Sequence, residues 1–238
     1  MFNLPRRPFF SAKKSDKAKS AAIAHKQSFI QFAADDLAYF KENVAGIAKN
    51  IDNETLNKLP PGKFEGEIVL IDQKKQVNDC IERIRQDQIL GIDSETRPNF
   101  IKGERHQVAL FQISTASTAF LFRLNKIGFP HGLTDLLEDP EIIKIGLALE
   151  NDLPELRRFG PINPASLVDL NKLCPQLGFE MIGARKLTAL FFGYRVSKAQ
   201  QTSNWEIENL TDAQMVYAAT DAWICREIYL KICGITPA

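Results

Sequence analysis

The chain has 238 residues, 45% of them hydrophobic, which is enough for one substantial core and a small appendage. Its 30 basic and 29 acidic residues nearly cancel, yet residues 1–30 hold seven Lys or Arg against one acid, a net charge of +6. The other residues hold 23 bases and 28 acids, a net charge of −5. This balance excludes a protein that coats nucleic acid through overall positive charge. No apolar run approaches the length of a membrane span, so no membrane partner is expected.

The four cysteines are scattered, with no Cys-x-x-Cys and no zinc-type spacing to histidine. This usage predicts reduced, mostly buried thiols and a cytoplasmic protein. The basic, acid-poor N-terminus leaves an organellar transit segment open as a second possibility.

Residues 1–60 are predicted to form a basic extension, partly disordered, that precedes a domain at 61–238. Residues 1–27 show little apolar periodicity and are expected to be disordered. Apolar residues then recur at helical spacing over 28–47, which predicts an amphipathic helix whose apolar stripe docks on the main body or on another chain. A short helix is expected at 52–59, with Asp52 or Asn53 as its N-cap and Pro60-Pro61-Gly62 closing it.

The domain that follows shows strand and helix patterns in a mixed order. Strands are predicted at 67–71, 89–96, 107–114, 118–124, 142–147 and 167–168, the third and fourth forming a hairpin. Helices are predicted at 74–86, 131–137, 151–159, 169–174, 183–192 and 211–232, the last with Thr211 and Gln214 as a capping box. This order predicts an α/β fold with a mixed sheet flanked by helices.

Asp93 and Glu95 stand two residues apart at the end of the predicted strand 89–96, so both side chains should leave the same face of the sheet. Two like charges at such a place are costly unless a cation neutralises them, and a divalent metal ion is the usual partner. The chain contains three Asp-x-Glu pairs, at Asp52/Glu54, Asp93/Glu95 and Asp139/Glu141. The first falls at a helix start and the third in a loop beside a proline, which leaves the strand-end pair as the candidate metal site.

Further candidates lie downstream. Asp152 follows the predicted strand 142–147, although Asn151 or Asp152 could simply cap the next helix. Tyr217 and Asp221 are at positions i and i+4 of the last helix and share one face. A buried tyrosine bonded to a neighbouring aspartate would account for that pair if it stood alone.

Taken in order, these residues resemble the DEDDy family of 3′–5′ exonucleases, and most of all its ribonuclease D and Werner-type branch. The flanking segments agree: Asp93-Ser94-Glu95-Thr96-Arg97-Pro98, Gln112-Ile113-Ser114, Asp169, Ser203-Asn204-Trp205, and Tyr217-Ala218-Ala219-Thr220-Asp221-Ala222. The resemblance covers roughly residues 65–233. One departure is Asn151, at a position where many members carry an aromatic residue.

The resemblance implies a ribonuclease H-like fold, with an N-terminal helical extension here, and hydrolysis assisted by two divalent ions, Mg²⁺ or Mn²⁺. Asp93 would bridge both ions, Glu95 and Asp221 would complete the first site, and Asp152 would serve the second. Tyr217 would orient the attacking water, because a phenol is a poor base at neutral pH. The family's other branch carries a histidine five residues before the last aspartate, where this chain has Val216.

The implied partner is the 3′ end of a single strand of DNA or RNA, and the implied products are nucleoside 5′-monophosphates. Lys102, Arg105 and Lys198 are candidate phosphate contacts, although a solvated surface charge would account for any one of them. Trp205 or Phe100 could stack on a terminal base, although core packing suits Trp205 as well. Two alternatives stay open: a nucleic-acid-binding module of the same fold with weak catalysis, and a phosphodiesterase for short oligonucleotides.

Overall fold

The computed structural model describes residues 28–99, 103–180 and 183–235. Six strands form one sheet: β1 (Glu67–Ile71), β2 (Ile89–Thr96), β3 (Val108–Ser114), β4 (Thr118–Phe122), β5 (Ile143–Gly146) and β6 (Leu167–Asp169). The α-helices are α1 (Ala34–Asn43), α2 (Asn53–Lys58), α3 (Val77–Ile84), α4 (Leu124–Ile127), α5 (His131–Glu138), α6 (Leu149–Leu156), α7 (Leu170–Gln176), α8 (Ala184–Phe192) and α9 (Asp212–Ile232). A 3₁₀ turn, η2 (Lys74–Gln76), directly precedes α3, and a second one, η3 (Arg157–Phe159), directly follows α6. The prediction of a mixed α/β sheet flanked by helices is confirmed.

The strand order in the sheet is β1-β4-β3-β2-β5-β6. β2, β3 and β4 form an antiparallel meander, while β1 pairs with β4, β5 with β2 and β6 with β5 in parallel. The neighbouring strands β2 and β5 therefore have their carboxyl ends at the same end of the sheet. In open α/β sheets, ligands usually bind at the carboxyl ends of such parallel strands.

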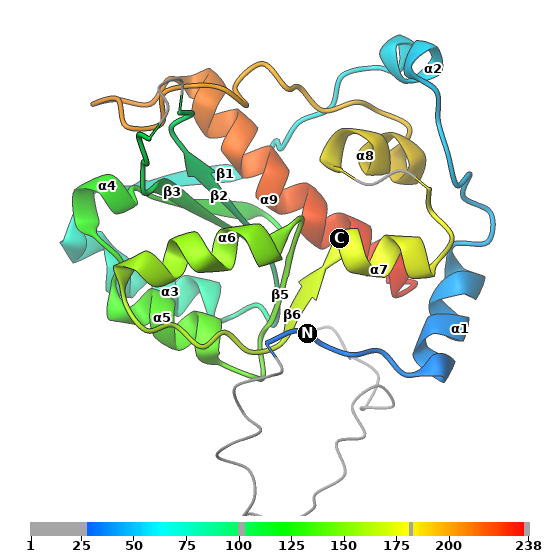
Figure 1. Cartoon of the computed structure of the whole chain (residues 1–238), viewed down its shortest axis with the longest axis horizontal. Coiled ribbons are helices and arrows are strands. Elements are labelled where there is room, and N and C mark those ends of the chain that lie inside the picture. The colour runs from blue at the N-terminus through cyan, green and yellow to red at the C-terminus, as the bar shows by residue number, and fades with distance from the viewer. Residues whose placement is uncertain (1–27, 100–102, 181–182, 236–238) are drawn as a thin grey trace, which may run out of the picture.

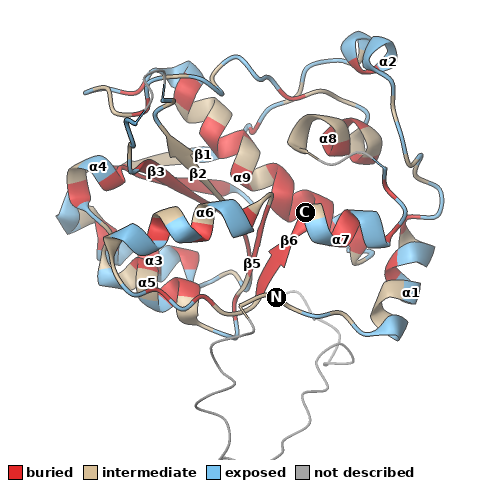
Figure 2. Cartoon of the chain, viewed as in Figure 1, coloured by how far each residue is buried: buried red, intermediate tan, exposed pale blue. Residues whose placement is uncertain are grey.

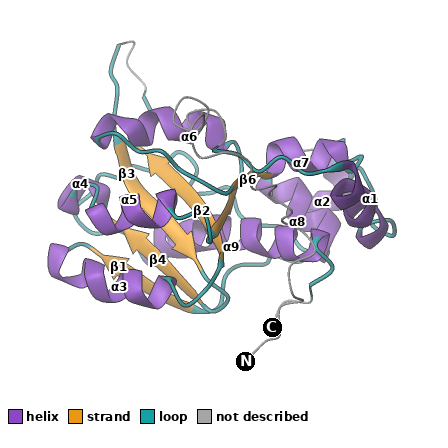
Figure 3. Cartoon of the chain, turned by 90° about the horizontal axis from the view of Figure 1, so that it is seen from below, coloured by secondary structure: helices purple, strands orange, loops and turns teal. Residues whose placement is uncertain are grey.

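Helices cover both faces of the sheet (Figures 1 and 3). The long helix α9 crosses one face, and α3, α5 and α6 pack on the other with a core that includes Ile84, Ile92, Phe111 and Leu153. Every residue of β3 and β4 is buried, and buried residues are red in Figure 2. Within the described segments, no helix is both long and apolar enough to cross a membrane.

The described part of the N-terminal extension packs on the domain. Phe40 of α1 and the C-cap residue Val44 are buried against the C-terminal half of α9. Before α1, the chain lies along the edge of the sheet, where the Ile30 amide donates to the Leu167 carbonyl at 2.8 Å and the Leu167 amide to Ser28 at 2.9 Å. The division at residue 60 stays a prediction, and the segment expected to be disordered, 1–27, lies outside the described residues.

Three local predictions are wrong. The single helix expected over 28–47 covers only Ala34–Asn43, because residues 28–30 pair with β6 instead. The helix expected to begin at Asn151 begins two residues earlier, and its N-cap is Ala148 in the left-handed conformation rather than Asn151 or Asp152. The strand expected to run through Leu124 stops at Phe122, and the turn α4 follows it.

Candidate active site

Strand β2 brings Asp93 and Glu95 to the face of the sheet that α9 covers. Helix α9 can lie close to the strand because Gly91 has no side chain there: a Cβ on Gly91 would stand 1.9 Å from the Ala222 carbonyl oxygen. Arg226 ties the same helix to the start of the strand, donating from Nε to the Ile89 carbonyl at 2.9 Å. This close packing sets Asp221 of α9 opposite Asp93.

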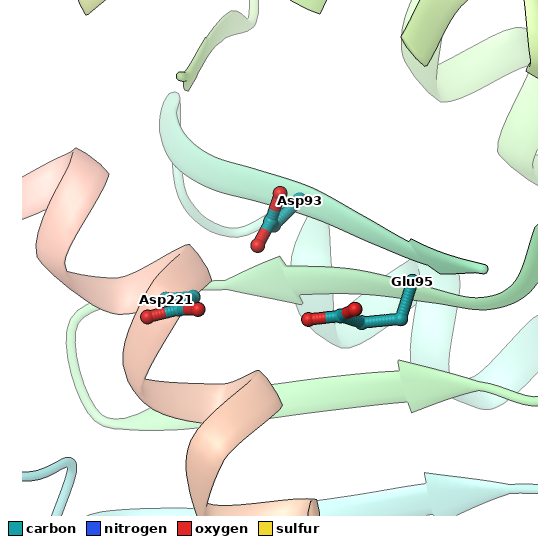
Figure 4. Close-up of side chains that lie close together, drawn as sticks. All are labelled: Asp93, Glu95 and Asp221. Carbon is teal, nitrogen blue, oxygen red and sulfur yellow. The ribbon is translucent and has the colours of Figure 1, made fainter. Parts of the chain in front are cut away.

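The carboxylates of Asp93, Glu95 and Asp221 point toward one another (Figure 4), and one oxygen from each lies within 4.8 Å of the others. Two of these side chains come from one strand and the third from a helix more than a hundred residues later. The predicted meeting of the first acid pair with the acid of the last helix is what the structure shows.

Burial raises the pKa of each of these carboxyls, and repulsion from neighbouring carboxylates adds to the shift for Asp93 and Glu95. For Asp93 the causes are burial and then the charge of Asp221, and for Glu95 they are burial and then the charges of Asp93 and Asp221. The pKa of Asp221 is raised by burial, while the Tyr217 hydroxyl and the Lys198 ammonium act in the opposite direction. A compact group of half-buried acids is suited to receive positive charge.

Asp152 reaches this group from the other face of the sheet. It lies in the first turn of α6, where the Ser94 hydroxyl, on the face opposite Asp93, hydrogen-bonds to its carboxylate. Burial and the charge of Asp93 raise the pKa of Asp152 to about 8. Asp152 is therefore an electrostatic neighbour of Asp93, although it stands outside the tight group of three.

Asp169 fixes the turn that carries Asp152. Its buried carboxylate accepts the amide of Ala148 at 3.1 Å, where the chain enters α6 with a φ of 56°, and the amide of Asn171 at 2.9 Å. A non-glycine residue in the left-handed region needs such support. Sequence reasoning assigned no role to Ser94 or Asp169, and their places within the flanking segments were the one available signal.

Tyr217 lies one helical turn before Asp221, and its hydroxyl hydrogen-bonds to that carboxylate. Burial and the charges of Asp221 and Glu95 raise the pKa of the phenol well above its usual range. Tyr217 is consequently a neutral hydrogen-bond donor at the site, consistent with the predicted orienting role and not with that of a base.

The predicted nucleic-acid contacts have different outcomes. Lys198 is exposed and close enough to Asp221 to lower the pKa of that carboxyl, and Arg105 is exposed on the connection between β2 and β3. Lys102 and Phe100 lie outside the described residues. Trp205 is 0% exposed and packs beside Leu110, Leu121 and Tyr217, so the prediction that it stacks on a base is wrong, and it is a core residue.

The donor set suits a hard divalent cation. Four carboxylates with no thiol or imidazole among them are the ligands that Mg²⁺ and Mn²⁺ prefer over softer metals. Their raised pKa values also favour a cation, because a bound cation would offset the repulsion between the carboxylates and the cost of burying their charge. The residues present therefore fit a metal centre.

Comparisons with known proteins agree with this chemistry. Residues 68–234 match the family model for a 3′–5′ exonuclease. A curated relative, exonuclease 3′-5′ domain-containing protein 2 of Drosophila melanogaster, is 36% identical over 150 residues, which are 61% of this chain and 25% of the relative. The chain thus spans about a quarter of that protein's length.

Solved structures show the same fold. Escherichia coli RNase D, an exoribonuclease, has a TM-score of 0.65 at 23% identity, covering 71% of this chain and 44% of that one. The complex of Trypanosoma brucei RNase D with RNA U12 has a TM-score of 0.63 at 17% identity, covering 72% and 64%. The ribonuclease H-like architecture implied by the sequence is thereby confirmed. Because the match to the family model covers most of this chain, the chain belongs to the 3′–5′ exonuclease family.

Proposed function

We propose that the chain is a metal-dependent 3′–5′ exonuclease of the DEDDy type, which removes nucleoside 5′-monophosphates from the 3′ end of a single strand. The observation that carries the proposal is the convergence of Asp93, Glu95 and Asp221, with Asp152 beside them and Tyr217 bonded to Asp221. The family membership of the chain supports the same reaction.

Two divalent ions, Mg²⁺ or Mn²⁺, are the proposed cofactors, with Asp93, Glu95 and Asp221 as ligands of one and Asp93 and Asp152 as ligands of the other. Such ions, when bound, stabilise the charge that develops during phosphodiester hydrolysis and lower the pKa of water. The protein's own part is to hold the four carboxylates in place. The Ser94 hydrogen bond positions Asp152 and favours its ionised form, and the close packing of α9 on Gly91 places Asp221.

Tyr217 supplies a neutral hydroxyl beside Asp221, in a position to orient a water molecule without accepting its proton. Lys198 offers an exposed positive charge near Asp221, which suits a phosphate of the incoming strand. Arg105 is the second proposed backbone contact. Because the described residues proposed for this site are suited to metal, water and phosphate rather than to base edges, we propose a strand of DNA or RNA as the substrate, supported for RNA by the structural neighbour bound to RNA U12.

The proposed location is the cytoplasm. The four cysteines support it, since all four are free thiols and three of them are buried.

Single strands of DNA and RNA with a label at either end test the proposal. With Mg²⁺ or Mn²⁺ the wild type should shorten strands stepwise from the 3′ end, and Asp93→Asn and Asp221→Asn should abolish this. Glu150→Gln is the matched control, because Glu150 is an exposed acid of α6 paired with Lys172. Cleavage that survives chelation of metal, or no cleavage of any strand, would contradict the proposal. Activity confined to strands of a few nucleotides would select the oligonucleotide phosphodiesterase instead.

A further inference from the structure

Gln112 lies beside Asp93 in the sheet. The two residues are directly paired across the antiparallel strands β2 and β3. Directly paired residues send their side chains to the same face, with Cβ atoms about 4.5–5.5 Å apart. Gln112 therefore stands on the α9 face, next to the carboxylate that is shared in the proposed metal centre.

The carboxamide of Gln112 is fully enclosed. The residue is 0% exposed, and neither Oε1 nor Nε2 has a hydrogen-bond partner in the part of the chain that the structure describes. Leaving a buried amide without partners costs about 1–3 kcal/mol, so such groups are rare unless the site uses them.

The other neighbours of Gln112 on this face give its amide little to bond. Leu110 and Leu121 flank it along β3 and across β4, and both belong to the apolar cluster beneath α9. Ser114, the next residue of β3 on the same face, donates its hydroxyl to the Thr115 carbonyl. Asp93 is directly opposite Gln112 and Glu95 is one residue pair further along, so the Asp93 carboxylate is the polar group of the sheet that the register sets beside the amide.

We propose that Gln112 is a positioning residue for Asp93: its Nε2–H group donates to the ionised, metal-bound carboxylate and fixes its orientation from the sheet side. This inference rests on the proposed function. A carboxylate that serves two ions has little freedom to rotate, and a hydrogen bond from a neighbouring side chain is the usual means of holding such a ligand.

The variant Gln112→Met separates this role from simple packing, because methionine keeps the length of the side chain and removes the amide. Replacing an unpartnered buried amide with an apolar group of similar shape is neutral or stabilising. We therefore expect the variant, in EDTA, to unfold at the same temperature as the wild type or higher. Its affinity for Mn²⁺, measured by titration calorimetry, should nevertheless fall about 10- to 100-fold.

Ser114→Ala is the matched control, since it removes a polar atom from the same strand and face, one residue pair further from Asp93. Its Mn²⁺ affinity should equal that of the wild type. If Gln112→Met instead lowers the unfolding temperature and leaves Mn²⁺ affinity unchanged, Gln112 is a core residue only and the inference is wrong.

A measurement on the wild type does not depend on any variant folding. The side-chain NH₂ signals of Gln112 in a ¹⁵N spectrum should shift when Mg²⁺ is added, while those of the exposed Gln176 stay in place. Unmoved Gln112 signals in a protein that does bind Mg²⁺ would overturn the inference. A wild type that binds Mn²⁺ no better than Asp93→Asn would instead overturn the proposed function, so the two failures are distinct.

Discussion

The hydroxyl of Tyr217 and the carboxylate of Asp221 share a hydrogen bond on one face of α9. The phenol stays protonated because burial and the surrounding acids raise its pKa. Within the proposed mechanism its task is to orient water, and Asp221 could bind a metal ion without it.

Tyr217→Phe should therefore lower kcat by about 10- to 100-fold, the effect of losing one hydrogen bond to a charged group. The affinity for Mn²⁺ should stay within about twofold, because all four carboxylates remain. Steady-state kinetics on a labelled strand, together with a calorimetric Mn²⁺ titration, would check both. A variant with the full rate would show that the hydroxyl takes no part in the reaction.

Single residues of the site differed in how far the sequence could reveal them. Asp93 and Glu95 could be predicted because a strand ending in two acids has a period of two, and Asp221 because it shares a helix face with Tyr217. Trp205 could not be assigned, because an indole in a polar loop has the same local pattern whether it is buried or exposed. Gln112 stood in a flanking segment that resembles the family, but its place opposite Asp93 became visible only in the paired strands.

At the scale of elements, the approach of α9 to β2 decides where Asp221 lies. Gly91 permits this approach because a side chain there would meet the Ala222 carbonyl. The variant Gly91→Ala should lower the free energy of unfolding by about 1–3 kcal/mol and should weaken Mn²⁺ binding, since it pushes the helix and Asp221 away from Asp93.

Gly46→Ala is a suitable control, because a Cβ on Gly46 would meet no atom within 4 Å. Chemical denaturation and Mn²⁺ titration of both variants would check the expectation. If Gly91→Ala binds Mn²⁺ as the wild type does, the distance between α9 and β2 does not control the site.

The elements themselves were predictable where their periodicity is strong. The strands of the meander and the helix α9, with its Thr211–Gln214 capping box, have the expected places. The predictions that are wrong depend on distant partners. Residues 28–30 could not be told from helix because their partner is the edge of β6, and the start of α6 could not be located because Asp169 supports Ala148 from 21 positions away.

For the whole molecule, the clustered, half-buried acids make stability depend on pH. Because the pKa of Asp152 and of its neighbours is raised in the folded state, the metal-free protein binds more protons than the unfolded chain between about pH 4 and the folded-state pKa of about 8. This contribution to the free energy of unfolding is present at the acidic end and is lost as the pH rises through the folded-state pKa values.

In EDTA, the variant Asp93→Asn should accordingly unfold at a higher temperature than the wild type, with a difference that grows from pH 5 to pH 8. Mn²⁺ should reverse the order at pH 8, since a metal ion favours the ionised carboxylates of the wild type. Thermal unfolding at both pH values, with and without Mn²⁺, gives the comparison. A difference in unfolding temperature that shrinks with rising pH would show that ionisation of these acids does not destabilise the folded protein.

The positions of the acids along the chain also determine when the site can be completed during protein synthesis. Asp93 and Glu95 leave the ribosome early, whereas Asp221 arrives on α9 after all six strands have been made. Since domains fold as the chain emerges, the incomplete nascent protein holds two or three of the four acids and cannot assemble the full site. The site of the proposed nuclease would thus stay incomplete until α9 has emerged and docked on the sheet.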